Sequence, residues 1–566
     1  MMITTMQKLR TLILAGVIIF TALNSLFAQE KKKSYSEEIT VTAPYEPSVS
    51  EANKISFLPR ITDTAIRFQK QSYLIKPFPI QSNVSIKPLE AARVSGESPK
   101  KLYRNYLKGG LGTTSSPYVE FFASSAANTN HLISVHLKHL SSSGSIKDQW
   151  FPGFSENLGE VSGKLFTDRN VLSLSAAYNR DVVHYYAPKI FKGDKLHEPT
   201  EDSLRQRYGL IKASFEIKSK NDDDEGIVYS LKTDAAHLAD YYKTEETNIH
   251  VIGMFQKSAE WLTFADKQYL GIHIIVDHNI LTNPIKKNAA TILELFPSYR
   301  FLFDEYQITL GLKTNFDFDS VSHLYIYPFI EARVQLVPDR LSAWAGISGG
   351  LDRSNFNALR QTNPYISSLT GVITSNERFN IFAAIKGNIA QLIDLEARFE
   401  SKIIDKMPLF VNDTVKKSHQ RRFDVITDDI NLMRVLFSAR YSGESFHIRL
   451  QGIWNNYSTN AEQYAWNCPA IEGQIEAGVA INQKWSLNTS VFAWGDSYTK
   501  TWNQNNIPVA KIMKGATDLN IGLQYNPVSQ FTAFLNLNNI LNRNYERWNL
   551  YPAFGFNAMA GVSFSF

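Results

Sequence analysis

The sequence has a single cysteine, Cys468, in 566 residues, which excludes an intrachain disulfide and a Cys-x-x-Cys metal site. Its 59 basic and 54 acidic residues leave a net charge of +5, too small a surplus at this length to indicate a nucleic-acid partner. Beyond the N-terminus there is no run of the roughly 18 to 20 apolar residues that a membrane-spanning helix needs. The GxSxG, HExxH, P-loop and GxGxxG motifs are also lacking. We therefore expect no enzymatic activity, no catalytic residues, no metal and no cofactor.

The first residues have the pattern of an export signal. Lys8 and Arg10 precede an apolar run at residues 12–23, and small Ala28 follows shortly after. A basic start, a short apolar core and a small residue at the cleavage position are typical of a secretory signal peptide. The sequence predicts a signal peptide at residues 1–28, and an exported chain without disulfides must gain its stability elsewhere, for example in a membrane.

Residues 29–105 differ in composition from the rest of the chain. Seven of the 21 prolines lie between Pro44 and Pro99. Proline has no backbone N–H and favours an extended conformation in the residue before it. We expect an extended, Pro-rich periplasmic segment here.

From residue 106 onward, apolar and polar side chains alternate in one stretch after another. In residues 471–481 the odd positions are apolar or glycine, whereas Glu472, Gln474 and Glu476 occupy the opposite face. Roughly twenty such stretches fit into residues 106–566, and no series of amphipathic helices separates them. The sequence predicts an all-β fold over residues 106–566, with one short helix within residues 357–368.

A soluble sandwich also alternates in this way, but three features favour a transmembrane antiparallel β-barrel. Many stretches reach the length of about 9 to 11 residues that a tilted strand needs to cross the hydrocarbon layer. The 35 Phe, 26 Tyr and 9 Trp include many at stretch ends, which suits interfacial girdles. The sequence ends on an alternating strand whose last residue is Phe566. Among the girdle candidates are Trp454, Trp485, Trp494, Tyr525, Trp548 and Tyr551.

Connection lengths are uneven, as in barrels with long outer loops and short inner turns. Residues 141–157, 182–204 and 352–376 are long enough for extracellular loops, whereas residues 525–529 read as a tight turn. The acidic residues 221–226 lack the spacing of a calcium loop, and a solvated turn is the favoured interpretation.

Residues 535–566 resemble the last two strands of TonB-dependent outer-membrane receptors. Asn539-Ile540-Leu541-Asn542-Arg543-Asn544-Tyr545 matches the turn that these receptors carry, and Phe564 and Phe566 match their barrel-assembly signal. Near the predicted mature N-terminus, Glu38-Ile39-Thr40-Val41-Thr42-Ala43 looks like a TonB box, the short strand that would pair with TonB; an ordinary extended segment is the alternative. The resemblance implies about 22 strands.

The chain departs from that family in one respect. Receptors of this kind carry a plug domain of well over a hundred residues between box and barrel, whereas here only residues 44–105 are available. The resemblance is therefore to a plugless relative.

Charged residues gather on the faces that would line the lumen. Both signs occur together, which argues against strong ion selectivity. They could line an aqueous pore, dock the N-terminal segment, or simply be solvated. These lumen-facing candidates are Glu396, Arg398, Glu400, Arg434, Arg440, Arg449, Glu472 and Glu476.

The sequence supports two hypotheses about the function of the protein. The first is solute uptake or passage across the outer membrane of a Gram-negative type of cell. The second is a structural or assembly barrel that recruits partners through its N-terminal arm. In either case we expect contact with outer-membrane lipid, with the barrel-assembly machinery during insertion, and with TonB or other periplasmic or outer-membrane proteins.

Overall fold

The computed structural model describes residues 103–125, 130–186, 199–220, 226–319, 321–413, 421–503, 505 and 507–566. The predicted signal peptide, the TonB-box-like residues 38–43, most of the Pro-rich segment and residues 221–225 of the acidic cluster lie outside these ranges. Within the described residues, no helix combines the length and hydropathy needed to cross a membrane.

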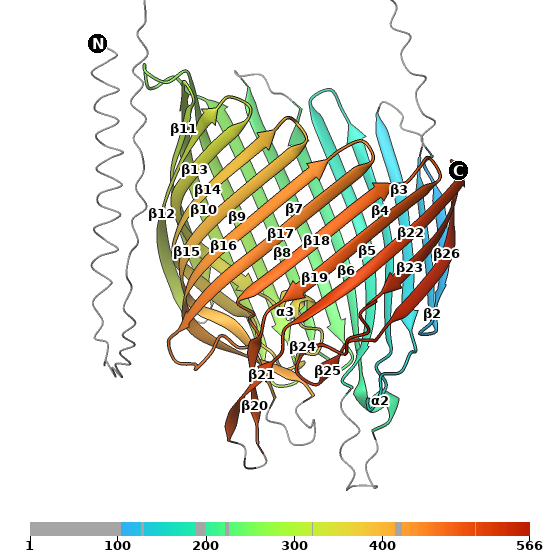
Figure 1. Cartoon of the computed structure of the whole chain (residues 1–566). Helices are drawn as coiled ribbons and strands as arrows, with labels where there is room; N and C mark the ends of the chain where they lie inside the picture. Colours follow the sequence, from blue (N-terminus) through green and yellow to red (C-terminus); the bar gives the residue numbers. More distant parts are fainter. Residues whose placement is uncertain are drawn as a thin grey trace, which may run out of the picture. The chain divides into compact units, whose positions relative to one another are not determined.

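The chain forms a closed antiparallel barrel of 22 strands (Figure 1). Each wall strand pairs with the next wall strand along the sequence, and β1 closes the ring by pairing with β26. The predicted fold class and strand number are confirmed. The wall strands are β1 (Tyr106–Gly112), β2 (Ser116–Ser124), β3 (His131–Ser142), β4 (Phe154–Phe166), β5 (Asn170–His184), β6 (Arg205–Ser219), β7 (Ile227–Asp240), β8 (Glu245–Ser258), β9 (Lys267–Thr282), β10 (Lys287–Phe303), β11 (Tyr306–Phe318), β12 (Ser322–Val337), β13 (Leu341–Ser354), β14 (Ile373–Ile389), β15 (Ile393–Asn412), β16 (Phe423–Ser442), β17 (Phe446–Thr459), β18 (Ile471–Ala480), β19 (Trp485–Trp494), β22 (Ala516–Val528), β23 (Phe531–Asn538) and β26 (Asn557–Ser565).

In the part of the chain that the structure describes, six short elements lie outside the wall. The helices are α2 (Glu201–Leu204) and α3 (Phe356–Thr362), and the second of these confirms the short helix predicted within residues 357–368. The strands β20 (Ser497–Trp502) and β21 (Pro508–Met513) form one hairpin, and β24 (Glu546–Trp548) and β25 (Tyr551–Pro552) form another.

The outer face of the wall is apolar. Leu174 on β5 is 62% exposed and Leu111 on β1 is 74% exposed, values that are unfavourable in water but suited to lipid contact. On β26, Val562, Phe564 and Phe566 are exposed at alternate positions, and serines separate them. Because each wall strand pairs with a neighbour on both sides, the backbone of such a wall can lie in hydrocarbon with its polar groups hydrogen-bonded within the ring.

The two ends of the barrel differ. At one end, which we call the turn end, Phe566 exchanges backbone hydrogen bonds with Asn105, and connections such as residues 304–305 are short. At the other, the loop end, lie all three connections that were predicted to be long. The tight turn expected at residues 525–529 lies slightly later, at residues 529–530, because a bulge between Tyr525 and Val528 lets β22 continue through Pro527.

Aromatic side chains mark the turn end on the outside. Trp261 stacks on Tyr299 with ring centroids 5.4 Å apart, and Trp485 packs on Tyr525 at 4.5 Å. This fits an interfacial girdle. The prediction that Tyr551 belongs to the girdle is wrong. Tyr551 is buried at the loop end, inside a hydrophobic cluster that also contacts Trp548.

The seam where the ring closes is short and tight. β1 has seven residues, and its Gly110 lies opposite Gly561 of β26. A Cβ atom added to Gly561 would lie 2.1 Å from the carbonyl oxygen of Gly109. The two strands can approach at this distance only because side chains are absent there.

Several strands exceed the length needed to cross a bilayer. β15 and β16 each have 20 residues, against about 9 to 11 for a tilted crossing. The extra residues extend at the loop end, where their inner faces carry apolar side chains such as Phe410 and Phe423. These apolar residues pack against the loops that fold over at that end.

Candidate functional site

The eight charged residues predicted for the lumen lie on four neighbouring strands, β15 to β18, at positions that alternate with exposed apolar side chains. Arg398 pairs with Glu400 at 2.8 Å, and the Nε of Arg434 donates to the side chain of Asn455 at 2.8 Å. Glu396 lies opposite Ser438 in the β15–β16 register. The structure brings these residues to one wall, and their role in function stays a prediction.

The other four of the eight differ in whether an ion pair neutralises their charge. Arg449 pairs with Glu476 at 3.2 Å, and Glu472 pairs with Arg547 of the loop end at 3.2 Å. Arg440 lies opposite Arg449 in the register of β16 and β17. Like charges directly opposite each other repel, so this pair is a local excess of positive charge.

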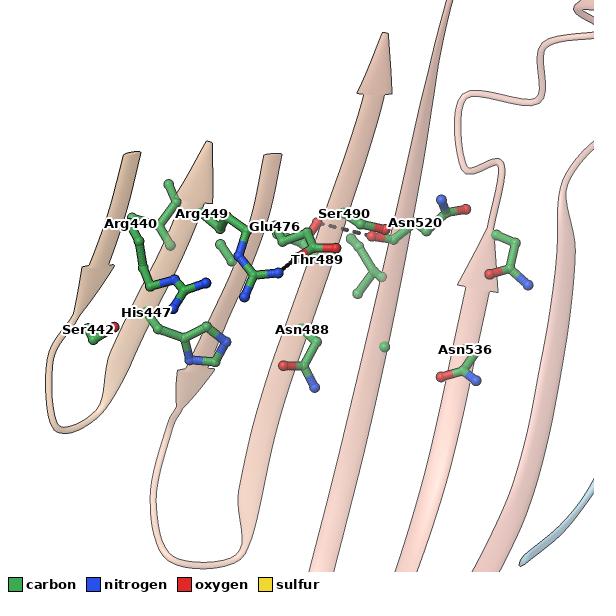
Figure 2. Close-up of a pocket in the computed structure, with 15 residues that line it drawn as sticks. Arg440, Ser442, His447, Arg449, Glu476, Asn488, Thr489, Ser490, Asn520 and Asn536 are labelled. Carbon is green, nitrogen blue, oxygen red and sulfur yellow. Dashed lines mark hydrogen bonds and ion pairs between the residues drawn. The ribbon is translucent and has the colours of Figure 1, made fainter. Parts of the chain in front are cut away.

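A pocket of about 560 Å³ surrounds these arginines at the turn end (Figure 2). We call it the Arg440 pocket. Its side chains come from β16 to β19, β22 and β23, and most of them are polar. They include Arg440, Ser442, His447, Arg449, Glu476, Asn488, Ser490, Asn520, Asn536 and Asn538.

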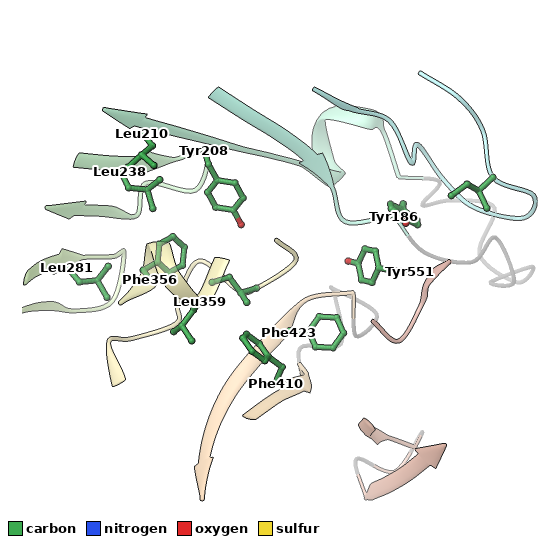
Figure 3. Packing of buried hydrophobic residues seen from close by; sticks show 12 residues of the cluster. Tyr186, Tyr208, Leu210, Leu238, Leu281, Phe356, Leu359, Phe410, Phe423 and Tyr551 are labelled. Atoms are coloured by element: carbon green, nitrogen blue, oxygen red, sulfur yellow. The ribbon is translucent and has the colours of Figure 1, made fainter. Parts of the chain in front are cut away.

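At the loop end, the connection between β13 and β14 folds against the inner wall. We call residues 355–372 the lid loop. Its side chains Phe356, Leu359 and Ile366 join a buried hydrophobic cluster (Figure 3). Because β6 and β9 lie several strands away from β13 around the ring, a contact between them has to cross the lumen. The cluster consists of Ile146, Tyr186, Tyr208, Leu210, Leu238, Leu281, Phe356, Leu359, Ile366, Phe410, Phe423 and Tyr551.

A buried carboxylate anchors the first turn of α3. The two carboxylate oxygens of Glu246 on β8 accept the backbone N–H groups of Phe356 and Asn357, each at 2.8 Å. Asn279 donates its side-chain amide to the same carboxylate at 3.1 Å. Asn355 caps the helix by accepting the N–H of Ala358. The sequence thus supplies both the cap and the wall residue that hold the helix in place.

The second half of the lid loop is held by backbone bonds. Phe423 at the start of β16 donates to the carbonyl of Tyr365 at 3.0 Å and accepts from Ser367 at 2.7 Å, as in a strand pair. The hydroxyl of Thr244 donates to the carbonyl of Ser368 at 2.6 Å. Tyr185 donates its hydroxyl to the carbonyl of Ile366 at 2.8 Å. The lid loop is therefore tied to three separate parts of the barrel.

The tyrosines of this region act as permanent donors. Burial raises the pKa of Tyr185 well above the usual value for tyrosine, and it raises the pKa of Tyr365 as well. Their hydroxyl groups therefore stay protonated at any physiological pH. The ring of Tyr365 stacks on that of Tyr551 with centroids 3.6 Å apart, which joins the lid loop to the β24–β25 hairpin.

Beside the lid loop lies a second pocket of about 560 Å³, which we call the loop-end pocket. Aromatic rings and two arginines line it, and it is therefore of a different character from the Arg440 pocket. Its lining includes Tyr186, Tyr365, Tyr545, Trp548, Arg360 and Arg547.

Sequence reasoning missed the lid, although a signal for it exists. On β6, the odd positions Ile211 and Phe215 face outward, so the even positions Tyr208 and Leu210 face inward. They point toward a lumen that was expected to be filled with water. Apolar residues on the wet face of a barrel strand indicate that another part of the protein covers them. Glu246 gave no such signal, because its partners lie more than a hundred residues away.

No protein-family model matches the chain, and no curated protein matches it in sequence. Solved structures match in shape. FpvA of Pseudomonas aeruginosa, solved with heterologous pyoverdines, gives a TM-score of 0.62 at 9% identity, over 83% of this chain and 72% of that one. The FrpB iron transporter of Neisseria meningitidis gives 0.61 at 11% identity, over 83% and 82%. The siderophore receptor PirA of Acinetobacter baumannii gives 0.60 at 10% identity, over 82% and 81%.

At such low identity the likeness shows the fold. The barrel of this chain has the fold of these solved structures, which agrees with the barrel that the C-terminal resemblance implied.

Proposed function

We propose that the protein is a transport barrel of the outer membrane, through which a solute passes from the cell surface to the periplasm. The observation that carries this proposal is the closed ring with an apolar outer face and a polar lumen. Such a ring is stable in a bilayer, and its charged inner wall suits a hydrated path.

The orientation follows from the connections. Outer-membrane barrels have short periplasmic turns and longer extracellular loops. The turn end, with Phe566, would therefore face the periplasm, and the loop end would face the exterior. In this orientation the loop-end pocket is the first site that an incoming solute meets.

The lid loop would act as the outer gate. It is held by Glu246, Thr244 and Phe423, so moving it away from the wall requires these contacts to break.

Residues 38–43 would couple this barrel to TonB. Their position ahead of the barrel and their β-prone sequence suit pairing with an exposed strand edge. Replacing Val41 by Pro removes a backbone donor in the middle of this segment. Energised accumulation of solute should then fall to the level of cells without TonB, and equal accumulation in both would contradict the coupling.

Conductance of the purified protein in planar bilayers tests the transport proposal. We expect the wild type to conduct rarely, and a variant whose residues 356–371 are replaced by a short Gly-Ser linker to conduct steadily. Glu246→Gln should lie between the two, because it removes the charge from the helix anchor.

Glu245→Gln is the matched control, since Glu245 is the exposed neighbour of Glu246 on β8. Correct folding is checked by heat-modifiable migration in gels. If folded variants without the lid loop conduct no more than the wild type and pass no solute in liposome swelling, the transport proposal is wrong.

A further inference from the structure

The Arg440 pocket holds hydrogen-bond donors that the protein itself does not use. The side chains of Arg440, His447 and Asn488 form no hydrogen bond or ion pair with any other described residue. The side chain of Asn536 on β23 likewise forms no hydrogen bond with another described residue. All four line one pocket, so their donors are directed to the same volume (Figure 2).

The one carboxylate among the described lining residues already has partners. The Glu476 carboxylate accepts from Arg449 at 3.2 Å and from Gln474 at 2.6 Å. Asn520 accepts the backbone N–H of Asn539 through its side-chain oxygen. The charged donors of the pocket therefore outnumber its charged acceptors, and the free acceptors that remain are neutral amide and hydroxyl groups.

The charges point the same way. Arg440 and Arg449 contribute two positive charges, and Glu476 alone among the described lining residues contributes a negative one. Arg449 donates to Glu476 through its Nη1, and its side chain is 42% exposed. Two opposed guanidinium groups with free donors form a binding site for an oxyanion, because they can bind it through parallel N–H groups.

The uncharged residues of the pocket indicate which groups the solute carries besides its anion. Among the described residues of the pocket there is no Phe, Tyr or Trp, whereas Asn488, Asn520, Asn536 and Asn538 form an amide wall across three strands. Amide groups suit hydroxyl-bearing solutes, and about 560 Å³ is the size of a pocket for a small molecule.

We propose that the Arg440 pocket binds a small solute that combines one carboxylate or phosphate with several hydroxyl groups, such as a sugar acid or a sugar phosphate. This inference rests on the proposed function and names the class of solute at the periplasmic end of the path.

Isothermal titration of the purified, full-length mature protein in detergent tests the proposal with four probes: glucuronate, glucose 6-phosphate, glucose and sulfate. We expect glucuronate or glucose 6-phosphate to bind and to be preferred over both glucose and sulfate; which of the two binds identifies the anion. Arg440→Gln and Arg449→Gln should each weaken binding roughly tenfold or more, since each removes charge-assisted hydrogen bonds.

Arg333→Gln is the matched control, because Arg333 lies on the lumen side of β12 and its loss changes the net charge equally. Arg440→Lys should restore part of the binding, since it keeps the charge but not the guanidinium. The proposal fails if neither anion binds, if glucose binds as well as glucuronate, or if Arg333→Gln weakens binding as much as Arg440→Gln. The titration needs no open gate, so a protein that conducts but binds neither anion would refute this inference and leave the transport proposal standing.

Discussion

At the scale of single residues, the anchor of the lid is a carboxylate that pairs with backbone groups. Glu246 is 2% exposed, and it holds two N–H groups of α3 that would otherwise be buried without partners. Such donors cost free energy when they lose their acceptor. Replacing Glu246 by Gln should therefore destabilise the docked lid by about 1 to 3 kcal/mol.

Hydrogen exchange measures this effect. We expect faster exchange at Phe356 and Asn357 in Glu246→Gln and unchanged exchange in the central strands of the wall. Exchange that is equally fast in the Glu245→Gln control, or unchanged in both variants, would show that the carboxylate does not hold the helix.

The single cysteine gives a second prediction at this scale. Burial raises the pKa of the Cys468 thiol to about 12, against a reference of 9.0. At pH 8 the reactive thiolate is therefore a very small fraction. Maleimide should label the folded protein slowly and the denatured protein at once, as mass spectrometry would show. Fast labelling of the folded protein would mean that the β17–β18 loop opens in solution.

At the scale of elements, the strands could be read from the sequence and the lid could not. The alternation in residues 471–481 predicts β18 almost to the residue, because neighbouring side chains of a wall strand meet two different solvents. The lid loop depends on contacts between Phe356 and strands far away in the sequence, and no local pattern encodes these. The apolar residues Tyr208 and Leu210 at inward-facing positions were the signal for the lid loop that the sequence contained.

The last strand carries a prediction about assembly. Phe564 and Phe566 lie exposed on the outer face of β26, where a barrel-assembly machine could reach them. Phe566→Ser should lower the amount of folded protein in outer-membrane fractions severalfold, as heat-modifiable migration would show. Ser565→Ala, a change at the preceding position, should have little effect. Equal amounts of all three proteins would remove the basis for an assembly signal.

At the scale of the whole molecule, the proposed gate is one loop. The Thr244 hydroxyl donates to the Ser368 carbonyl at 2.6 Å, so a short bifunctional methanethiosulfonate should join cysteines placed at these two positions. In a Cys468→Ser background, this reagent should abolish solute uptake by the variant with both Thr244→Cys and Ser368→Cys, and dithiothreitol should restore it. Each single cysteine variant is the control; uptake that continues in the fully cross-linked protein would show that the lid loop is not the gate.

The pairing of β1 with β26 decides whether the barrel stays closed. β1 is the shortest strand of the wall, with seven residues, and its pairing with β26 completes the ring. If it parted, two bare strand edges would meet hydrocarbon, which cannot solvate them. A bulky side chain at Gly561 would therefore disrupt the pairing of β1 with β26 as a whole, and the closed barrel would become an open sheet.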